Sequence, residues 1–263
     1  KILIHPQALR LVSQNLDLVD SELKNSFEAN DLFLSLLIDY GNPERVLRRM
    51  NEVGFLGAFI PDFGRIVALM QFNTYHWFTV DEHTIQCLKV LSKIEKLPKN
   101  YGTAVEEIFA RKSLNRKVLY LSILFHDIGK GLENDHSIEG EKIATKLCKR
   151  FSLKDSERKK ICWLVRNHLM MSDFAQKRDL SDQKTIIDFQ EYVTDRETLD
   201  LLFILTVCDI KGVSSDAWNN WKRSLLESLY FQTLQLVSKD IKIETRSERI
   251  DAAKTKLCCI YSL

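Results

Sequence analysis

The stretch Leu119–Gly131, LYLSILFHDIGKG, decides the fold, because an apolar helical run ends there on two adjacent polar residues, His126 and Asp127. Counting back from His126 by three and seven positions gives Ile123 and Leu119. Residues at these spacings share one face of an α-helix, and an apolar face is expected to pack into the core. The imidazole of His126 is therefore predicted to point inward.

Four further polar residues extend this pattern. By the same spacing, His168 shares a helix face with Val165 and Ile161, and Asp209 shares one with Thr206 and Leu202. His83 shares a face with Cys87, Val90 and Leu91. His136 directly precedes another predicted helix. A single inward histidine is most often a hydrogen-bonded core residue. Several buried histidines and acids must satisfy one another, however, and a shared divalent metal ion does this efficiently. The combination predicts a metal centre.

The composition sets the class of protein. Of 263 residues, 45% are hydrophobic and only nine are glycine and four proline, while apolar residues recur at three- and four-residue spacing, so we expect an almost entirely α-helical fold. The net charge of +2 provides no overall field for nucleic acid or an anionic membrane. Six cysteines without a CxxC pair indicate a reducing cytoplasm, and we expect no signal peptide and no membrane span.

Three parts are expected along the chain. Residues 1–72 are predicted to form a helical lead-in, with a helix that starts at Asn42-Pro43 and ends near Gly54. Residues 73–237 are predicted to form the main domain, and 238–263 a linker or truncated tail. Within the main domain we predict helices over 82–95, 103–110, 116–127, 137–150, 155–170, 184–193, 197–210 and 218–234.

The order of the polar residues resembles the HD superfamily of metal-dependent phosphohydrolases. Its H, HD, H, H, D pattern matches this sequence at His83, His126-Asp127, His136, His168 and Asp209. No GxxxxGK or GxGxxG loop is present that could bind phosphate instead. The resemblance implies an HD-type helical bundle with two ions, the second held by His136 and His168, and with Asp127 bridging both. Lys130 would then steady phosphate charge beside catalytic His126 and Asp127, although a solvated lysine at a helix end is equally expected.

A longer set of stretches resembles one family within that superfamily. They are residues 42–72, TVDEHT (79–84), HDIGKG (126–131), DHSIEGEKIA (135–144), WLVRNHLMMS (163–172), AQKRDLSD (175–182) and LTVCDIKGV (205–213). This family is the bifunctional uridylyltransferase/uridylyl-removing enzymes of bacterial PII nitrogen signalling. The resemblance implies that the HD domain hydrolyses the phosphodiester joining UMP to a tyrosine of PII. It also implies a nucleotidyltransferase domain and glutamine-sensing ACT domains that have no counterpart in this sequence, so we expect the middle of a longer protein, with hydrolysis but without transfer from UTP.

Several points stay open at this stage. The metal is expected to be Mg²⁺ or Mn²⁺ from the resemblance, while Fe²⁺ and Zn²⁺ suit the same ligands. Lys177 and Arg178 are candidates to hold phosphate or an acidic loop of PII, but a charged turn is usually only solvated. The alternatives to uridylyl removal are an HD phosphohydrolase of a free nucleotide or cyclic dinucleotide, and a non-catalytic PII-binding fragment.

Overall fold

The computed structural model describes residues 5–39, 41–70, 78–96, 103–111, 114–193, 195–214 and 216–237, and in these ranges every regular element is a helix. The predicted all-α fold is confirmed for this part of the chain. None of its helices is long and apolar enough to cross a membrane. The predicted tail, 238–263, lies outside the described residues.

The lead-in consists of short helices. They are α1 (Pro6–Gln14), α2 (Ser21–Asn25), α3 (Phe27–Ile38), α4 (Pro43–Glu52), α5 (Phe55–Phe59) and α6 (Pro61–Gly64), with a 3-10 turn at Leu16–Leu18. The predicted start of α4 is confirmed, with Asn42 as N-cap and Pro43 in the first turn. Gly54 has a φ of +79°, which a glycine adopts without a steric penalty, and it separates α4 from α5.

The larger helices follow. They are α7 (Val80–Ile94), α8 (Ala104–Ala110), α9 (Arg116–Phe125), α10 (His136–Arg150), α11 (Asp155–Arg166), α12 (Met170–Lys177), α13 (Gln183–Tyr192), α14 (Arg196–Val213) and α15 (Asn220–Val237). Seven of these match predicted helices to within a few residues: α7, α8, α9, α10, α13, α14 and α15. The predicted helix 155–170 was wrong in its length, because α11 ends at Arg166 and a separate helix, α12, begins at Met170.

The break between α11 and α12 has a local cause in two side chains. The amide of Asn167 donates to the carbonyl of Trp163 at 2.9 Å, and Nδ1 of His168 lies 2.8 Å from the carbonyl of Val165. In a continuous helix the Val165 carbonyl would accept from the backbone N–H of Leu169. The His168 ring thus takes the place of a backbone donor at the Val165 carbonyl, whereas the Trp163 carbonyl accepts from both the backbone N–H and the side-chain amide of Asn167. No glycine or proline marks this helix end.

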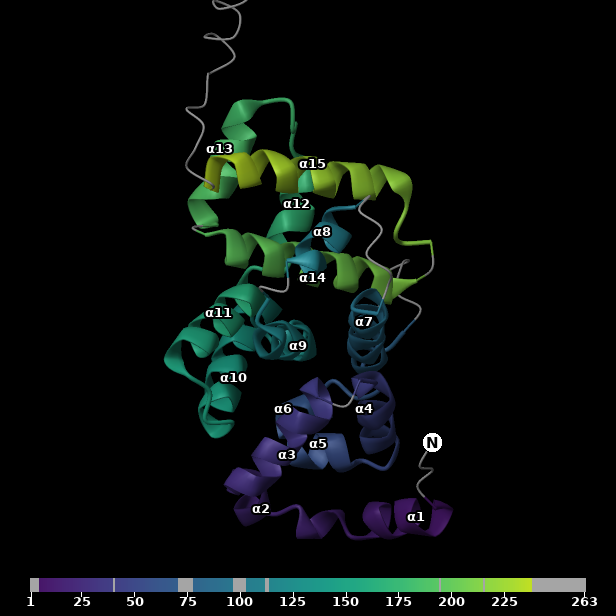
Figure 1. The fold of residues 1–263 in the computed structure, drawn as a ribbon. Helices are drawn as coiled ribbons and strands as arrows, with labels where there is room; N and C mark the ends of the chain where they lie inside the picture. Colours follow the sequence, from purple (N-terminus) through teal and green to yellow (C-terminus); the bar gives the residue numbers. More distant parts are fainter. Residues whose placement is uncertain are drawn as a thin grey trace, which may run out of the picture.

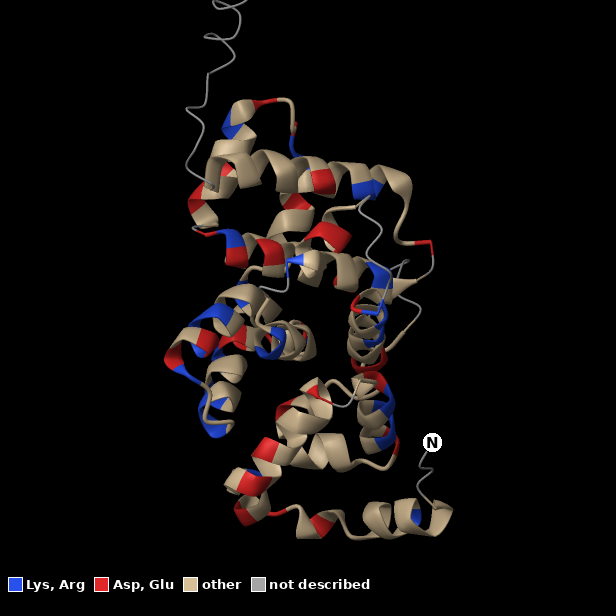
Figure 2. Cartoon of the chain, viewed as in Figure 1, with Lys and Arg blue, Asp and Glu red and all other residues tan. Residues whose placement is uncertain are grey.

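The arrangement in Figure 1 places the lead-in at one end and the pair α14 and α15 at the other, with α7, α9, α10 and α11 between them. Helix α9 is buried at every position from Val118 to Phe125, so it is the central helix of the bundle. His126 therefore faces the interior because the whole end of α9 does, and not only because of its helical register. Acidic and basic residues are interspersed along the helices in the view of Figure 2.

The lead-in is docked on the first turn of α7. Arg48 of α4 pairs with Glu82, and Asn51 donates to the carboxylate of Asp81 at 2.7 Å. The backbone N–H of Ala68 donates to the other oxygen of Asp81 at 3.2 Å. These contacts hold the turn of α7 that immediately precedes His83.

Candidate metal centre

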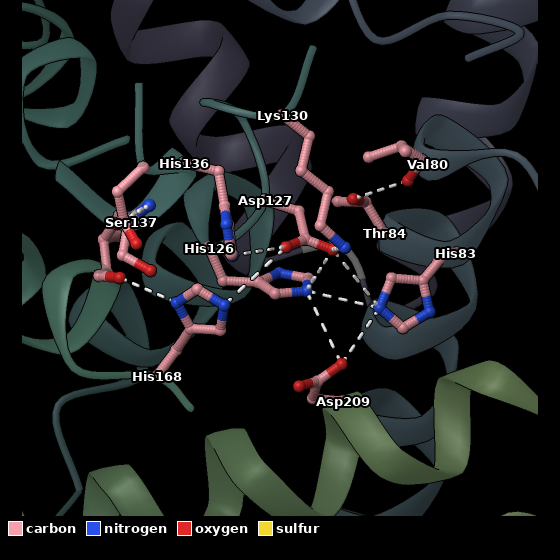
Figure 3. A network of polar contacts seen from close by, with 12 residues as sticks. Val80, His83, Thr84, His126, Asp127, Lys130, His136, Ser137, His168 and Asp209 are labelled. Carbon is pink, nitrogen blue, oxygen red and sulfur yellow. Dashed lines mark hydrogen bonds and ion pairs between the residues drawn. The ribbon is translucent and has the colours of Figure 1, made fainter. Parts of the chain in front are cut away.

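Six side chains meet where the ends of several helices converge, as Figure 3 shows. They are the six residues that the sequence pattern singled out: His83 from α7, His126 and Asp127 at the end of α9, His136 at the start of α10, His168 just after α11, and Asp209 from α14. The structure thus brings together residues separated by as many as 126 positions in the chain.

Two of the histidine rings are oriented by the same kind of hydrogen bond, from Nδ1 to a backbone carbonyl three residues earlier. Nδ1 of His126 lies 2.7 Å from the carbonyl of Ile123, as Nδ1 of His168 does at 2.8 Å from that of Val165. A carbonyl oxygen only accepts, so Nδ1 carries the proton in both rings, and Nε2 is left with a lone pair directed into the site. This tautomer is the one a metal ion needs at Nε2.

Asp127 is the centre of the arrangement, because its two oxygens face different histidines. Oδ2 lies 3.2 Å from Nε2 of His126 and 3.7 Å from Nε2 of His83. Oδ1 lies 3.9 Å from Nε2 of His136 and 3.7 Å from Nε2 of His168. The carboxylate therefore divides the site into a first donor group, His83, His126 and Asp209, and a second donor group, His136 and His168.

The first donor group is tightly gathered. Nε2 of His83 lies 3.0 Å from Oδ1 of Asp209 and 3.3 Å from Nε2 of His126. Nε2 of His126 lies 3.7 Å from the same Asp209 oxygen. Three donor atoms at such separations can bind one ion together.

The second donor group depends on a close approach between the α9–α10 loop and α10. A Cβ on Gly129 would lie 2.2 Å from the carbonyl oxygen of His136 and 2.6 Å from the N–H of Gly140, so only glycine fits there. The Asp135 carboxylate caps α10 by accepting from the N–H groups of Ser137 and Ile138. Together these features hold His136 beside Asp127.

The electrostatics differ between the two donor groups. Burial alone would lower the pKa of His83, but the nearby carboxylates of Asp209 and Asp127 outweigh it and raise this pKa. Burial would raise the pKa of both carboxyls, yet the surrounding histidines hold each well below its usual range, with Lys130 also lowering that of Asp127. In the second donor group, burial lowers the pKa of His136 and brings that of His168 to about 4.

The site residues differ in exposure to solvent. The side chains of His83, His126, Asp127 and His168 are at most 3% exposed, whereas those of His136 and Asp209 are 28% and 19% exposed. Lys130 is also partly exposed, at 16%, and its Nζ lies 2.6 Å from Oδ2 of Asp127. Solvent therefore reaches the cluster at His136, Asp209 and Lys130.

The donor set fits divalent metal ions. Nε2 of His136 and of His168 is buried and has no hydrogen-bond partner among the described residues. A buried polar atom without a partner costs free energy, and a metal ion would supply the missing contact. Ligand atoms of Asp127, His136 and His168 lie within 4.8 Å of one another, and so do those of His83, His126, Asp209 and Cys87.

Cys87 is the one member of this set that the sequence pattern did not suggest as a ligand. Its position four residues after His83 places both side chains on one face of α7, where a buried cysteine is most often a core residue. The spacing of four was the signal that could have identified it.

Lys177 and Arg178 form other contacts. Nζ of Lys177 pairs with Asp173 at 2.7 Å, and Arg178 pairs with Asp188 at 3.3 Å. The Arg178 guanidinium also lies 3.9 Å from the centre of the Phe174 ring. Their role toward a substrate stays a prediction.

Sequence comparison with known proteins identifies families that match two parts of this chain. Residues 80–210 match the HD domain family, and residues 2–59 match the family described as the uridylyltransferase GlnD third domain. The bifunctional uridylyltransferase/uridylyl-removing enzyme of Cereibacter sphaeroides is 50% identical over 255 residues, and that of Ruegeria pomeroyi is 50% identical over 261. In each comparison 97% of this chain is covered, against 27% and 28% of the relative.

The chain therefore belongs to the bifunctional uridylyltransferase/uridylyl-removing enzyme family, as a segment that carries its HD domain. It spans just over a quarter of the length of the two curated relatives. The predicted resemblance is confirmed at both the superfamily and the family level.

Proposed function

We propose that this segment removes uridylyl groups from the PII signalling protein, by metal-dependent hydrolysis of the phosphodiester that joins UMP to a tyrosine. The single observation that carries the proposal is the position of Asp127, whose two oxygens each face a different pair of histidines. This arrangement supports two ions, one with each donor group and Asp127 between them. The two relatives are named as uridylyl-removing enzymes, and this name supplies the reaction.

The roles of the residues follow from their placement. Two divalent ions held here would lower the pKa of a bound water and neutralise charge on the oxygens of the phosphoester. Nδ1–H bonds to backbone carbonyls keep His126 and His168 in the tautomer that binds through Nε2. Asp127, with its lowered pKa, stays ionised and can contact both ions.

Lys130 is placed to act on the substrate. Its ammonium group lies beside Asp127 and is partly exposed, so it could stabilise the negative charge of an incoming phosphate. The departing tyrosinate, whose parent pKa is about 10, is a tolerable leaving group and needs little protonation. Lys177 and Arg178 are proposed as outer contacts for PII, and Mg²⁺ or Mn²⁺ as the supporting ion in the cytoplasm.

The experiment is release of UMP from uridylylated PII by this chain with added Mn²⁺. Asp127→Ala should abolish release, whereas Asp31→Ala, a matched control at an exposed position of α3, should not change it. A panel of free nucleotides and cyclic dinucleotides run in parallel tests substrate class. Hydrolysis of the small phosphoesters but not of uridylylated PII would contradict the proposal, and so would a folded, metal-loaded chain that releases no UMP.

A further inference from the structure

Cys87 is a fully buried thiol that the proposed reaction does not use. It lies one helical turn after His83 on α7, with a relative exposure of 0%. Its Sγ lies 3.6 Å from Nε2 and 3.8 Å from Nδ1 of His83. The same sulfur is within 4.8 Å of ligand atoms of His126 and Asp209, so it belongs to the cluster of the first donor group.

The donor separations match those of a site with nitrogen and sulfur ligands. Tetrahedral coordination at about 2.0 Å from nitrogen and about 2.3 Å from sulfur places two nitrogens about 3.3 Å apart, and a nitrogen and a sulfur about 3.5 Å apart. Nε2 of His83 and of His126 are 3.3 Å apart, and Nε2 of His83 and Sγ of Cys87 are 3.6 Å apart. The separation of the thiol from Nε2 of His83 therefore allows a shared ion, while its 3.8 Å from Nδ1 shows that the sulfur also lies against the imidazole ring.

The neighbouring helix leaves space for this thiol. A Cβ on Gly212 would lie 2.4 Å from Sγ of Cys87, so a larger residue there would displace the sulfur. Gly212 is on α14, three residues after Asp209. The turn of α14 that supplies a carboxylate to the first donor group therefore also holds the thiol against it.

We propose that Cys87 is a sulfur ligand of the first metal position, alongside His83, His126 and Asp209. Thiolate is a soft ligand that favours Zn²⁺, Fe²⁺ or Co²⁺ over Mg²⁺, and a bound divalent ion deprotonates a coordinating thiol. The second position, with Asp127, His136 and His168, offers only nitrogen and oxygen. The two positions would therefore select different ions. This inference rests on the metal centre of the proposed function and not on its substrate.

The test reads the metal–sulfur bond directly. Cys258 and Cys259 are first replaced by serine, which removes two thiols from the end of the sequence. The zinc-loaded protein is then measured by X-ray absorption, and the cobalt-loaded protein by its near-ultraviolet spectrum. We expect a zinc–sulfur distance of about 2.3 Å and a thiolate-to-cobalt charge-transfer band. Neither measurement depends on turnover.

Two variants assign the sulfur. Cys87→Ala should lose the cobalt band and bind Zn²⁺ about tenfold or more weakly, with its Mn²⁺ affinity little changed. Cys148→Ala, which removes an equally buried thiol from α10, should keep both properties.

If the folded, metal-loaded parent protein shows only nitrogen and oxygen ligands, Cys87 merely packs on the His83 ring and the inference is overturned. This readout stands even if Cys87→Ala fails to fold. UMP release with no metal–sulfur bond would refute this inference alone, whereas absence of any bound metal would refute the proposed function as well.

Discussion

The two sides of the Asp127 carboxylate differ in how their histidines are satisfied. In the first donor group, His83 already contacts Asp209 and His126, and the carboxylates raise its pKa. In the second, Nε2 of His136 and of His168 has no hydrogen-bond partner among the described residues, and burial lowers both pKa values. The first group thus favours positive charge of any kind, including a proton, whereas the second presents neutral nitrogens for which a metal ion is the natural partner.

The largest expected effect comes from removing the residue that the two groups share. Asp127→Asn keeps the shape of the side chain but loses its negative charge, so both ions should bind weakly. We expect UMP release to fall by more than about a hundredfold. Metal analysis of the purified variant should show little of either ion. Full metal content with an unchanged rate would remove Asp127 from the centre.

Replacing one histidine from each group should separate the two sides. His168→Gln should weaken the second ion by about tenfold to a hundredfold and leave the first in place. His83→Gln should do the reverse. Calorimetric titration with Mn²⁺ measures both affinities. If each variant lost both ions equally, the division of the site at Asp127 would be wrong.

Gly129→Ala should perturb the second group through the backbone. The added methyl group would overlap the carbonyl of His136 and push the first turn of α10 away from Asp127. We expect a loss of about 1–3 kcal/mol in unfolding free energy, measured by urea denaturation, together with weaker binding of the second ion. Gly41→Ala controls for the added methyl group, because its Cβ would meet nothing within 4 Å. Its φ of +55° also predicts a loss of stability there, so the control is read on the binding of the second ion, which it should leave unchanged. Retention of the second ion in a stable Gly129→Ala variant would show that the close contact between Gly129 and the backbone of α10 is not required for binding.

Lys130→Met tests the role of the ammonium group beside Asp127. The variant removes the ammonium group beside Oδ2 of Asp127 and should leave both donor groups in place. We expect about a tenfold lower rate of UMP release with metal content unchanged. A rate equal to that of the parent would indicate that Lys130 is only a solvated residue at the end of the loop.

The smallest expected effect concerns the start of α14, the helix that carries Asp209. The Asp195 carboxylate caps this helix by accepting from the N–H and the hydroxyl of Thr198, and these bonds lower its pKa although partial burial opposes them. Because the pKa of Asp195 is lower in the folded state, its ionised carboxylate stabilises the fold at pH values above the ordinary pKa of 3.8. This stabilisation is lost as the pH falls through the pKa of the folded state. Asp195→Asn should therefore be less stable than the parent at neutral pH, by under about 1 kcal/mol, and the difference should vanish at acid pH. A difference independent of pH would mean that the carboxylate charge contributes nothing.

The sequence predicted most of this fold because the strongest signals were local. Apolar periodicity predicted seven of the large helices and the start of α11, and the inward positions of His83, His126 and Asp209 followed from helical register. The end of α11 could not be predicted, because it is made by the side chains of Asn167 and His168 rather than by glycine or proline. The separate helix α12 was missed for the same reason.

The site was predictable as a set of residues, but its internal arrangement was not. The polar residues could be placed inward from register alone, whereas the division at Asp127 depends on which of its oxygens faces which helix. Cys87 was missed because a buried cysteine is usually a core residue, and only its distance to His83 distinguishes it. Long-range distances of this kind are set by packing, which periodicity does not encode.

The central claim, that Asp127 lies between two metal positions, is tested most directly by anomalous X-ray diffraction from crystals soaked in Mn²⁺. We predict two peaks about 3.5–4 Å apart, one beside His83, His126 and Asp209 and the other beside His136 and His168, with a different Asp127 oxygen next to each. A single peak at full Mn²⁺ loading, or two peaks that Asp127 does not contact, would contradict the claim.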